Sequence, residues 1–204
     1  MINSIVIDTE TMDVRPSALI ISIGAIAFDV TDLEALRYNI SYAVKAEQHS
    51  SESYVFYHLL DANSQIMVGR TVSRSTQVWW KAQDDAAKAA LDGDKQDLKE
   101  VLEALTHWIA QYPDAQIYFR GTDFDGSILE SAYRAYDLKC PWKYNCKRDV
   151  RTFIDALSGS DKGYIADHEP CFAMIKHNSL HDAMNDAEQM AIAKNCFGAA
   201  VNAA

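Results

Sequence analysis

A short apolar run near the amino terminus ends in two acidic residues, and this arrangement constrains the fold more than any other feature. Residues 5–7 form the core of a predicted strand, and Asp8 and Glu10 follow directly. Successive side chains of a strand point to opposite faces, so these two carboxylates emerge on the same face, about 7 Å apart. Neighbouring carboxylates repel each other unless a cation lies between them, and their oxygens suit Mg²⁺ or Mn²⁺. The strand predicts one wall of a metal site, with a solvated strand end as the alternative.

Length and composition indicate a single folded domain. The chain has 204 residues, and 49% of them are hydrophobic, which is enough for a substantial core. No run approaches the roughly eighteen apolar residues of a membrane helix, and the start lacks the pattern of a signal peptide. We therefore expect a cytoplasmic protein with no membrane contact, whose one domain spans residues 1–204 with its core at about 4–195.

The net charge of −10 excludes one class of function. A protein that coats nucleic acid without specificity needs a broad basic face, which this composition does not provide. An enzyme that acts on nucleic acid can still be acidic, because its carboxylates serve as metal ligands and a local basic patch binds the substrate.

Hydrophobic patterns predict an α/β fold. The opening is expected to be an antiparallel meander of strands at residues 5–12, 19–28 and 35–44. Gly24, inside the second strand, is expected to allow a neighbouring element to approach closely. The remaining predicted elements are helices at 78–91, 98–112, 127–133, 149–157 and 179–196 and a strand at 117–119. This order indicates a mixed sheet flanked by helices.

Two further regions carry acid that this fold could bring to the first strand. Asp123 and Asp125 lie in a turn between a strand and a helix, and Asp182 and Asp186 lie four apart on the last predicted helix. Each pair also has an ordinary explanation, because aspartates cap helices and acids four apart form solvated helix faces. The combination with the first strand is what points to a site.

Three motifs, in this order, resemble the DEDD superfamily of 3′-5′ exonucleases, in its histidine-bearing (DEDDh) branch. They are Asp8-Thr9-Glu10-Thr11, Phe124-Asp125-Gly126-Ser127-Ile128-Leu129 and His177-Asn178-Ser179-Leu180-His181-Asp182-Ala183. The chain is more similar still to a phage and prophage group of exoribonuclease-like proteins. The features that carry this similarity are Asp8-Thr9-Glu10-Thr11-Met12, Trp79-Trp80, Cys140-Pro141-Trp142 and Asp149-Val150-Arg151-Thr152. The resemblance covers residues 4–195 and implies a ribonuclease H-like fold.

The resemblance also implies an activity. Members of this branch are metal-dependent 3′-5′ exonucleases that hydrolyse the terminal phosphodiester of single-stranded DNA or RNA and release nucleoside 5′-monophosphates. Relatives are often dimers, so a homodimer is compatible with the resemblance. Two other readings remain: a catalytically inactive nucleic-acid-binding domain of the same fold, and an enzyme directed to small oligonucleotides. An inactive domain would be expected to lack a metal ligand.

The implied metal ligands are Asp8, Glu10, Asp125 and Asp182, which would hold two Mg²⁺ or Mn²⁺ ions. His177 would accept a proton from the attacking water, a role that suits a pKa near neutrality.

Two alternatives for these ligands stay open. Asp123 could replace Asp125 as the ligand of the second motif, and the third motif can also be read in a second register, as His181 with Asp186.

Substrate contacts are expected where basic and aromatic side chains alternate. Arg148 and Arg151 lie in one such stretch, and Trp80 lies in another. Adjacent tryptophans on one helix point about 100° apart, so at most one of Trp79 and Trp80 is expected to face the substrate. Core packing is the alternative for each tryptophan.

Thr11 and Met12 directly follow the two carboxylates of the first strand. They are expected to lie where a 3′ end enters, with Met12 against the terminal base. The alternative for Met12 is packing within the turn.

Overall fold

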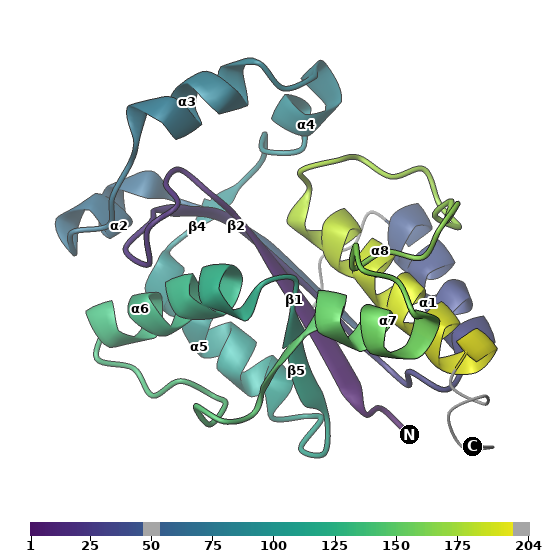
Figure 1. The fold of residues 1–204 in the computed structure, drawn as a ribbon. Helices are drawn as coiled ribbons and strands as arrows, with labels where there is room; N and C mark the ends of the chain where they lie inside the picture. Colours follow the sequence, from purple (N-terminus) through teal and green to yellow (C-terminus); the bar gives the residue numbers. More distant parts are fainter. Residues whose placement is uncertain (47–53, 198–204) are drawn as a thin grey trace.

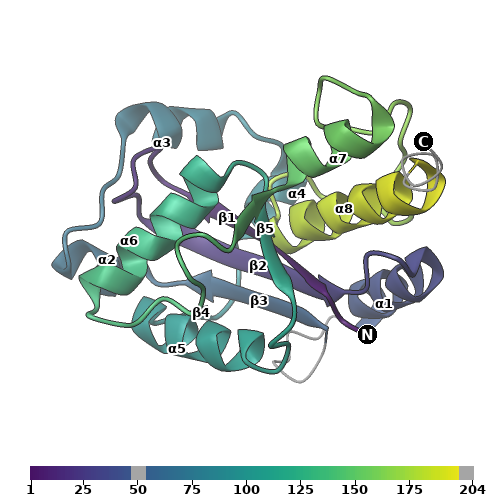
Figure 2. The ribbon, with the colours of Figure 1, turned by 60° about the horizontal axis from the view of Figure 1, so that its bottom comes forward.

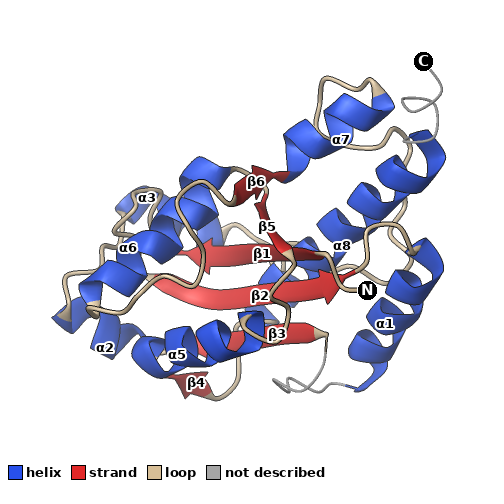
Figure 3. Ribbon diagram, turned by 90° about the horizontal axis from the view of Figure 1, so that it is seen from below, coloured by secondary structure: helices blue, strands red, loops and turns tan. Residues whose placement is uncertain are grey.

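A six-stranded mixed sheet forms the centre of the computed structural model, which describes residues 1–46 and 54–197. The strand order is β4-β3-β2-β1-β5-β6, as Figure 3 shows. The central strands β1, β2 and β3 are antiparallel, whereas β4, β5 and β6 each run parallel to their neighbour. The strands are β1 (Ser4–Thr11), β2 (Ile20–Phe28), β3 (Val55–Leu60), β4 (Lys95–Gln96), β5 (Gln116–Phe119) and β6 (Lys147–Asp149).

Helices cover both faces of this sheet (Figure 1). They are α1 (Leu33–Ala46), α2 (Ala62–Met67), α3 (Arg74–Lys81), α4 (Asp85–Ala89), α5 (Leu98–Ile109), α6 (Ser127–Ala135), α7 (Val150–Ser158) and α8 (Ser179–Ile192), with π-helical turns η1 (Thr122–Gly126) and η2 (Ala193–Phe197). None of the helices in the described ranges is both long and apolar enough to span a bilayer.

The mixed sheet flanked by helices confirms the predicted fold class, but the third strand of the meander was wrongly assigned. Residues 35–44 lie within α1, because Leu36 and Ile40 are buried at helical spacing and Asp32 accepts the backbone N–H of Ala35 at the start of the helix. The third strand is β3, in a stretch whose polar surroundings hid it.

The helix predicted at 78–91 is two helices. Asp84 accepts the backbone N–H of Ala87 and so starts α4 separately from α3. Ser73 caps α3 in the same way, several residues before the predicted start. The elements predicted at 98–112, 117–119, 127–133, 149–157 and 179–196 are confirmed as α5, β5, α6, α7 and α8 with its η2 extension.

Alternation along β1 divides the core into two layers. Ile5 and Ile7 face a cluster formed with α5 and α6, whereas Val6 faces a cluster formed with α1, α7 and α8. Figure 2 shows α1 and α8 side by side at one side of the sheet. Because the alternation continues, Asp8 and Glu10 project on the α8 side of the sheet.

Gly24 is the point at which α8 meets the sheet. It pairs with Asp8 across β1 and β2, and a Cβ atom at this position would overlap the backbone of Ser179 and Leu180. The hydroxyl groups of Ser22 and Ser179 also lie 2.9 Å apart. The predicted close approach at Gly24 is confirmed, and it holds the start of α8 directly beside Asp8.

We expect Gly24→Ala to displace α8. The added methyl group has no space against the helix backbone, so the free energy of unfolding should fall by about 3 kcal/mol or more, measured by urea denaturation. Gly159→Ala is the control, because Gly159 has φ 72° with no atom within 4 Å of its added Cβ. Its cost should be about 1 kcal/mol from backbone strain alone. Equal losses in the two variants would contradict the packing account.

Candidate active site

Four carboxylates from separate parts of the chain line one cleft of about 520 Å³. Asp8 and Glu10 come from β1, Asp125 from η1, and Asp182 from the first turn of α8. The fold therefore brings together side chains that are more than 170 residues apart at the extremes of the sequence.

Two hydrogen bonds from Thr9 hold the Asp125 carboxylate, just beyond the point where β1 and β5 stop pairing. The two strands pair as far as Val6 and Tyr118, which leaves the N–H of Thr9 without a strand partner on that side. This N–H and the Thr9 hydroxyl both donate to Oδ1 of Asp125, at 3.1 and 2.7 Å. Asp125 is buried, whereas Asp123 is exposed and does not line the cleft.

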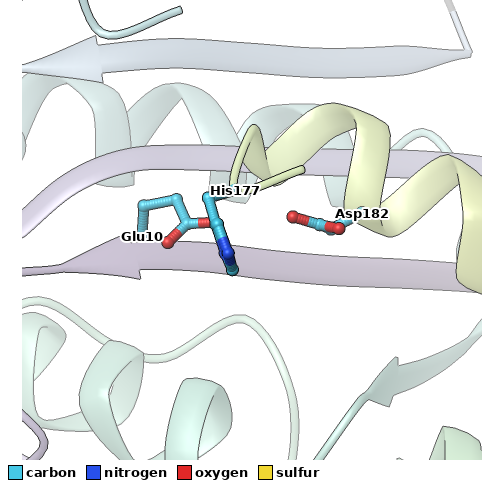
Figure 4. A group of neighbouring side chains, drawn as sticks. All are labelled: Glu10, His177 and Asp182. Carbon is cyan, nitrogen blue, oxygen red and sulfur yellow. The ribbon is translucent and has the colours of Figure 1, made fainter. Parts of the chain in front are cut away.

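The start of α8 presents His177 and Asp182 to Glu10. Asn178 caps the helix by accepting the N–H groups of Leu180 and His181. His177, one residue earlier, adopts a left-handed backbone conformation with φ 61°. Ligand atoms of Glu10, His177 and Asp182 all lie within 4.8 Å of one another, and Figure 4 shows the imidazole between the two carboxylates.

The other histidine and aspartate of the third motif have different partners. Nδ1 of His181 accepts the backbone N–H of Ile175 at 2.9 Å, which leaves this ring within the loop before α8. Asp186 lines the cleft, but its two carboxylate oxygens accept hydrogen bonds from Nε of Arg120 at 2.8 and 2.9 Å. Its Oδ1 also lies 2.7 Å from Nη2 of the same arginine. His177 and Asp182 therefore face Glu10. His181 instead bonds to the loop before α8, and Asp186 bonds to the arginine that follows β5.

Burial and mutual repulsion raise the pKa of every carboxyl group in the cluster. The pKa of Glu10 rises to about 9 and those of Asp125 and Asp182 to about 7, with burial as the largest cause. The pKa of Asp8 is also well above its usual value, through burial and then through Asp125 and Glu10. In the described part of the chain, none of these four groups forms an ion pair with lysine or arginine. Clustered hard oxygens that lack a positive partner fit a divalent cation such as Mg²⁺ or Mn²⁺.

The two tryptophans of α3 have different environments. Trp80 is 7% exposed, and its indole N–H donates to the carbonyl oxygen of Thr11 at 2.9 Å. Trp79 is 43% exposed and lines a groove of about 450 Å³ with Thr11 and Phe124. Its ring also meets the His177 ring edge to face, at 4.7 Å between centroids. Trp80, the tryptophan chosen from the sequence, is therefore mostly buried and does not line this groove, whereas Trp79 does.

Thr11 and Met12 also line different pockets. Thr11 lines the groove beside Trp79, as a substrate contact would require. Met12 instead lines a second pocket together with Trp80, outside the acidic cleft. The backbone of Met12 bonds to Leu19 and Ser73, which fixes the turn after β1.

The two predicted arginines differ as well. Arg151 lines the acidic cleft. Arg148 is exposed, does not line that cleft, and donates to the carbonyl oxygens of Asn145 and Lys147.

Sequence reasoning missed Arg120, which lies at the end of β5. Its guanidinium lies 4.0 Å from the ring centre of Tyr164, and Nη1 donates to the carbonyl oxygen of Gly163 at 2.9 Å. Together with its ion pair to Asp186, these contacts tie β5, α8 and the loop before α8 to one another. The strand at 117–119 was predicted, but no sequence pattern marks the single arginine that follows it.

Comparisons with known proteins give a family match and a similar fold. A sequence model of the 3′-5′ exoribonuclease Rv2179c-like domain matches residues 3–193, whereas no curated protein matches the chain. Among solved structures, the fold is similar to the nuclease domain of 3′hExo, a DEDDh family member, bound to rAMP. The TM-score is 0.57 at 12% identity, over 95% of this chain and 92% of that one. This likeness confirms the predicted ribonuclease H-like fold, and the family match confirms the resemblance to 3′-5′ exoribonuclease-like proteins. The chain belongs to the family of 3′-5′ exoribonuclease Rv2179c-like domains.

Proposed function

We propose that the protein is a metal-dependent 3′-5′ exonuclease that hydrolyses the terminal phosphodiester of single-stranded nucleic acid and releases nucleoside 5′-monophosphates. One observation carries the proposal: Asp8, Glu10, Asp125 and Asp182 converge in one cleft with His177 beside them. The family match adds that the nuclease is of the 3′-5′ exoribonuclease type, and RNA is accordingly the first substrate to examine.

The four carboxylates are the proposed ligands of two Mg²⁺ or Mn²⁺ ions. Their elevated pKa values support this role, because each group is destabilised as an anion until a cation joins it. When bound, such ions activate water and offset the charge that develops on the phosphate and the leaving oxygen. Thr9 contributes by fixing the orientation of Asp125 with two hydrogen bonds.

His177 is the proposed general base. Burial lowers the pKa of its imidazole below the usual 6.5, so the ring is neutral and can accept a proton at physiological pH. Trp79 packs against the ring, and the Asn178 cap fixes the backbone that follows it. The left-handed conformation of His177 is an uncommon state for a side-chain-bearing residue, which is typical of functional positions.

The groove beside the cleft is the proposed site of the 3′-terminal nucleotide. Thr11, Trp79 and Phe124 line it, so a base there would contact both an aromatic ring and the strand that carries Glu10. Arg151 and Lys176 line the adjoining acidic cleft and could neutralise phosphate. The alternative of an inactive binding domain has no comparable support, since all four proposed ligands line the cleft.

Activity is predicted to depend on the ligands and not on nearby acid. The wild-type protein should shorten 5′-labelled single-stranded RNA one nucleotide at a time from its 3′ end with Mg²⁺ or Mn²⁺, and EDTA should stop it. DNA of the same sequence is run in parallel. Asp8→Asn and Asp125→Asn should each lower kcat by about 10³-fold or more, because charge stabilisation at the phosphate is lost.

Asp123→Asn is the matched control, because Asp123 is exposed in the same turn as Asp125. It should retain full activity. Wild-type activity in Asp125→Asn, or loss of activity in Asp123→Asn, would contradict the ligand assignment.

The two histidines should respond differently to removal. We expect His177→Ala to lower kcat by about 10²- to 10⁴-fold with little change in melting temperature, because a proton acceptor is lost. His181→Ala should instead lower the melting temperature, because the N–H of Ile175 loses its acceptor, and should spare most of kcat. Thermal melts and steady-state kinetics of both variants test this, and the reverse pattern would favour the second register.

Metal-free protein should lose stability as the pH rises. The folded-state pKa values of about 7 to 9 exceed the usual values near 4, so the native state binds more protons than the unfolded state between these limits. Unfolding free energy therefore falls with increasing pH across this window. With EDTA, the melting temperature should be lower at pH 8.5 than at pH 6, and Mn²⁺ should raise it more at pH 8.5.

Asp182→Asn should show a smaller fall than the wild type, because one of the titrating groups is gone. A melting temperature that rises with pH in EDTA, or the same fall in both proteins, would contradict the electrostatic account.

A further inference from the structure

A second pocket, of about 390 Å³, lies on another side of Trp80 from the acidic cleft. Its walls are largely apolar and include Met12, Ile21, Leu60, Trp80 and Leu91. The Trp80 ring, which forms one wall, lies 6.2 Å from the ring of His177, which lines the acidic cleft. One aromatic side chain therefore stands between the two sites.

Three lysines, Lys81, Lys88 and Lys95, also line this pocket, and all three are exposed. Lys88 forms a surface ion pair with Asp85 at 3.1 Å. Within the described ranges, Lys81 and Lys95 form no ion pair with an acidic side chain. In a chain of net charge −10, Lys81 and Lys95 therefore supply two ammonium groups, beside the single carboxylate of Asp61, to one apolar pocket.

The combination of apolar walls and positive rim selects the chemistry of a ligand. An apolar pocket with a flat indole wall suits a planar ring, and ammonium groups at its mouth suit an anionic group. A nucleotide carries both. Asp61 also lines the pocket, and as the cap of α2 its carboxylate accepts the N–H of Ser64.

The pocket is connected to the proposed terminal-nucleotide groove through α3. Trp79 lines the groove, Trp80 and Lys81 line the pocket, and the three residues are consecutive at the end of this helix. On the other wall, Thr11 lines the groove and the next residue, Met12, lines the pocket. A single-stranded nucleic acid that crosses the end of α3 would therefore pass from the groove to the pocket.

We propose that this pocket binds an upstream nucleotide of the strand being degraded, with its base against Trp80 and Met12 and its phosphates beside Lys81 and Lys95. The inference rests on the proposed function, because it takes the occupant from the substrate of the adjoining cleft. It predicts that an oligonucleotide binds more tightly than the p-nitrophenyl ester of a nucleoside 5′-monophosphate, which carries no upstream nucleotide.

The test is the dependence of hydrolysis on substrate length in the double variant Lys81→Glu/Lys95→Glu. Its KM for an eight-nucleotide RNA should rise by about tenfold or more, while kcat and KM for the p-nitrophenyl ester of a nucleoside 5′-monophosphate stay at wild-type values. Lys45→Glu/Lys194→Glu carries the same charge change on α1 and η2 and is the control. An equal effect on both substrates, or an equal effect of the control variant, overturns the proposal.

A binding measurement separates this proposal from the proposed function. Fluorescence anisotropy of a labelled eight-nucleotide RNA is measured against protein carrying Asp8→Asn, with and without the two lysine substitutions. Losing two phosphate contacts should reduce the slope of log K against log salt by about 1.4. If the wild-type protein hydrolyses RNA but the lysine substitutions leave the slope unchanged, the pocket is overturned and the proposed function stands. If the wild-type protein has no nuclease activity but the lysine substitutions reduce the slope, the pocket stands and the proposed function is overturned.

Free nucleotide is the other source of the same chemistry, so adenosine monophosphate is titrated against both proteins in a third arm. Lysine-dependent binding of the monophosphate without any lysine effect on the eight-nucleotide RNA would overturn the assignment to the strand. Lysine dependence for the RNA supports it.

Discussion

The contact between α8 and β2 at Gly24 determines where the acidic groups meet. Because no side chain separates the helix from the strand, the first turn of α8 lies directly over Asp8, which pairs with Gly24 across the sheet. Asp182 and His177 are carried to Glu10 by the same contact. The proposed metal site, assembled from both ends of the chain, thus depends on the absence of one methyl group.

The charge balance of the cleft follows from its packing. Arg120 lines the cleft, but its guanidinium is bound to Asp186 and to the loop carbonyl of Gly163. It pairs directly with Asp186 and only partly offsets the raised pKa of Asp182. The four remaining groups keep raised pKa values, a state that favours proton or metal binding.

Most of the fold was readable from periodicity, and the errors have local causes. Strand alternation placed Asp8 and Glu10 on one face, and the apolar stripe of α5 was unambiguous. The third strand was misplaced because caps such as that of Asp32 decide between helix and strand and were overlooked. The direction in which each side chain faces was harder to predict. Spacing indicated that at most one of Trp79 and Trp80 faces the substrate. The hydrogen bond that holds Trp80 against Thr11 could not be read from the sequence. Arg120 was missed because a lone arginine carries no pattern.

The central claim is that Asp8, Glu10, Asp125 and Asp182 form one divalent-cation site. Anomalous diffraction from crystals soaked in Mn²⁺ together with a nucleoside monophosphate tests it most directly. The account predicts two strong peaks among these four carboxylates, roughly 4 Å apart as in other two-metal sites, with Asp186 still bound to Arg120. Peaks centred on Asp186 and His181, or no peak in the cleft at saturating Mn²⁺, would contradict it.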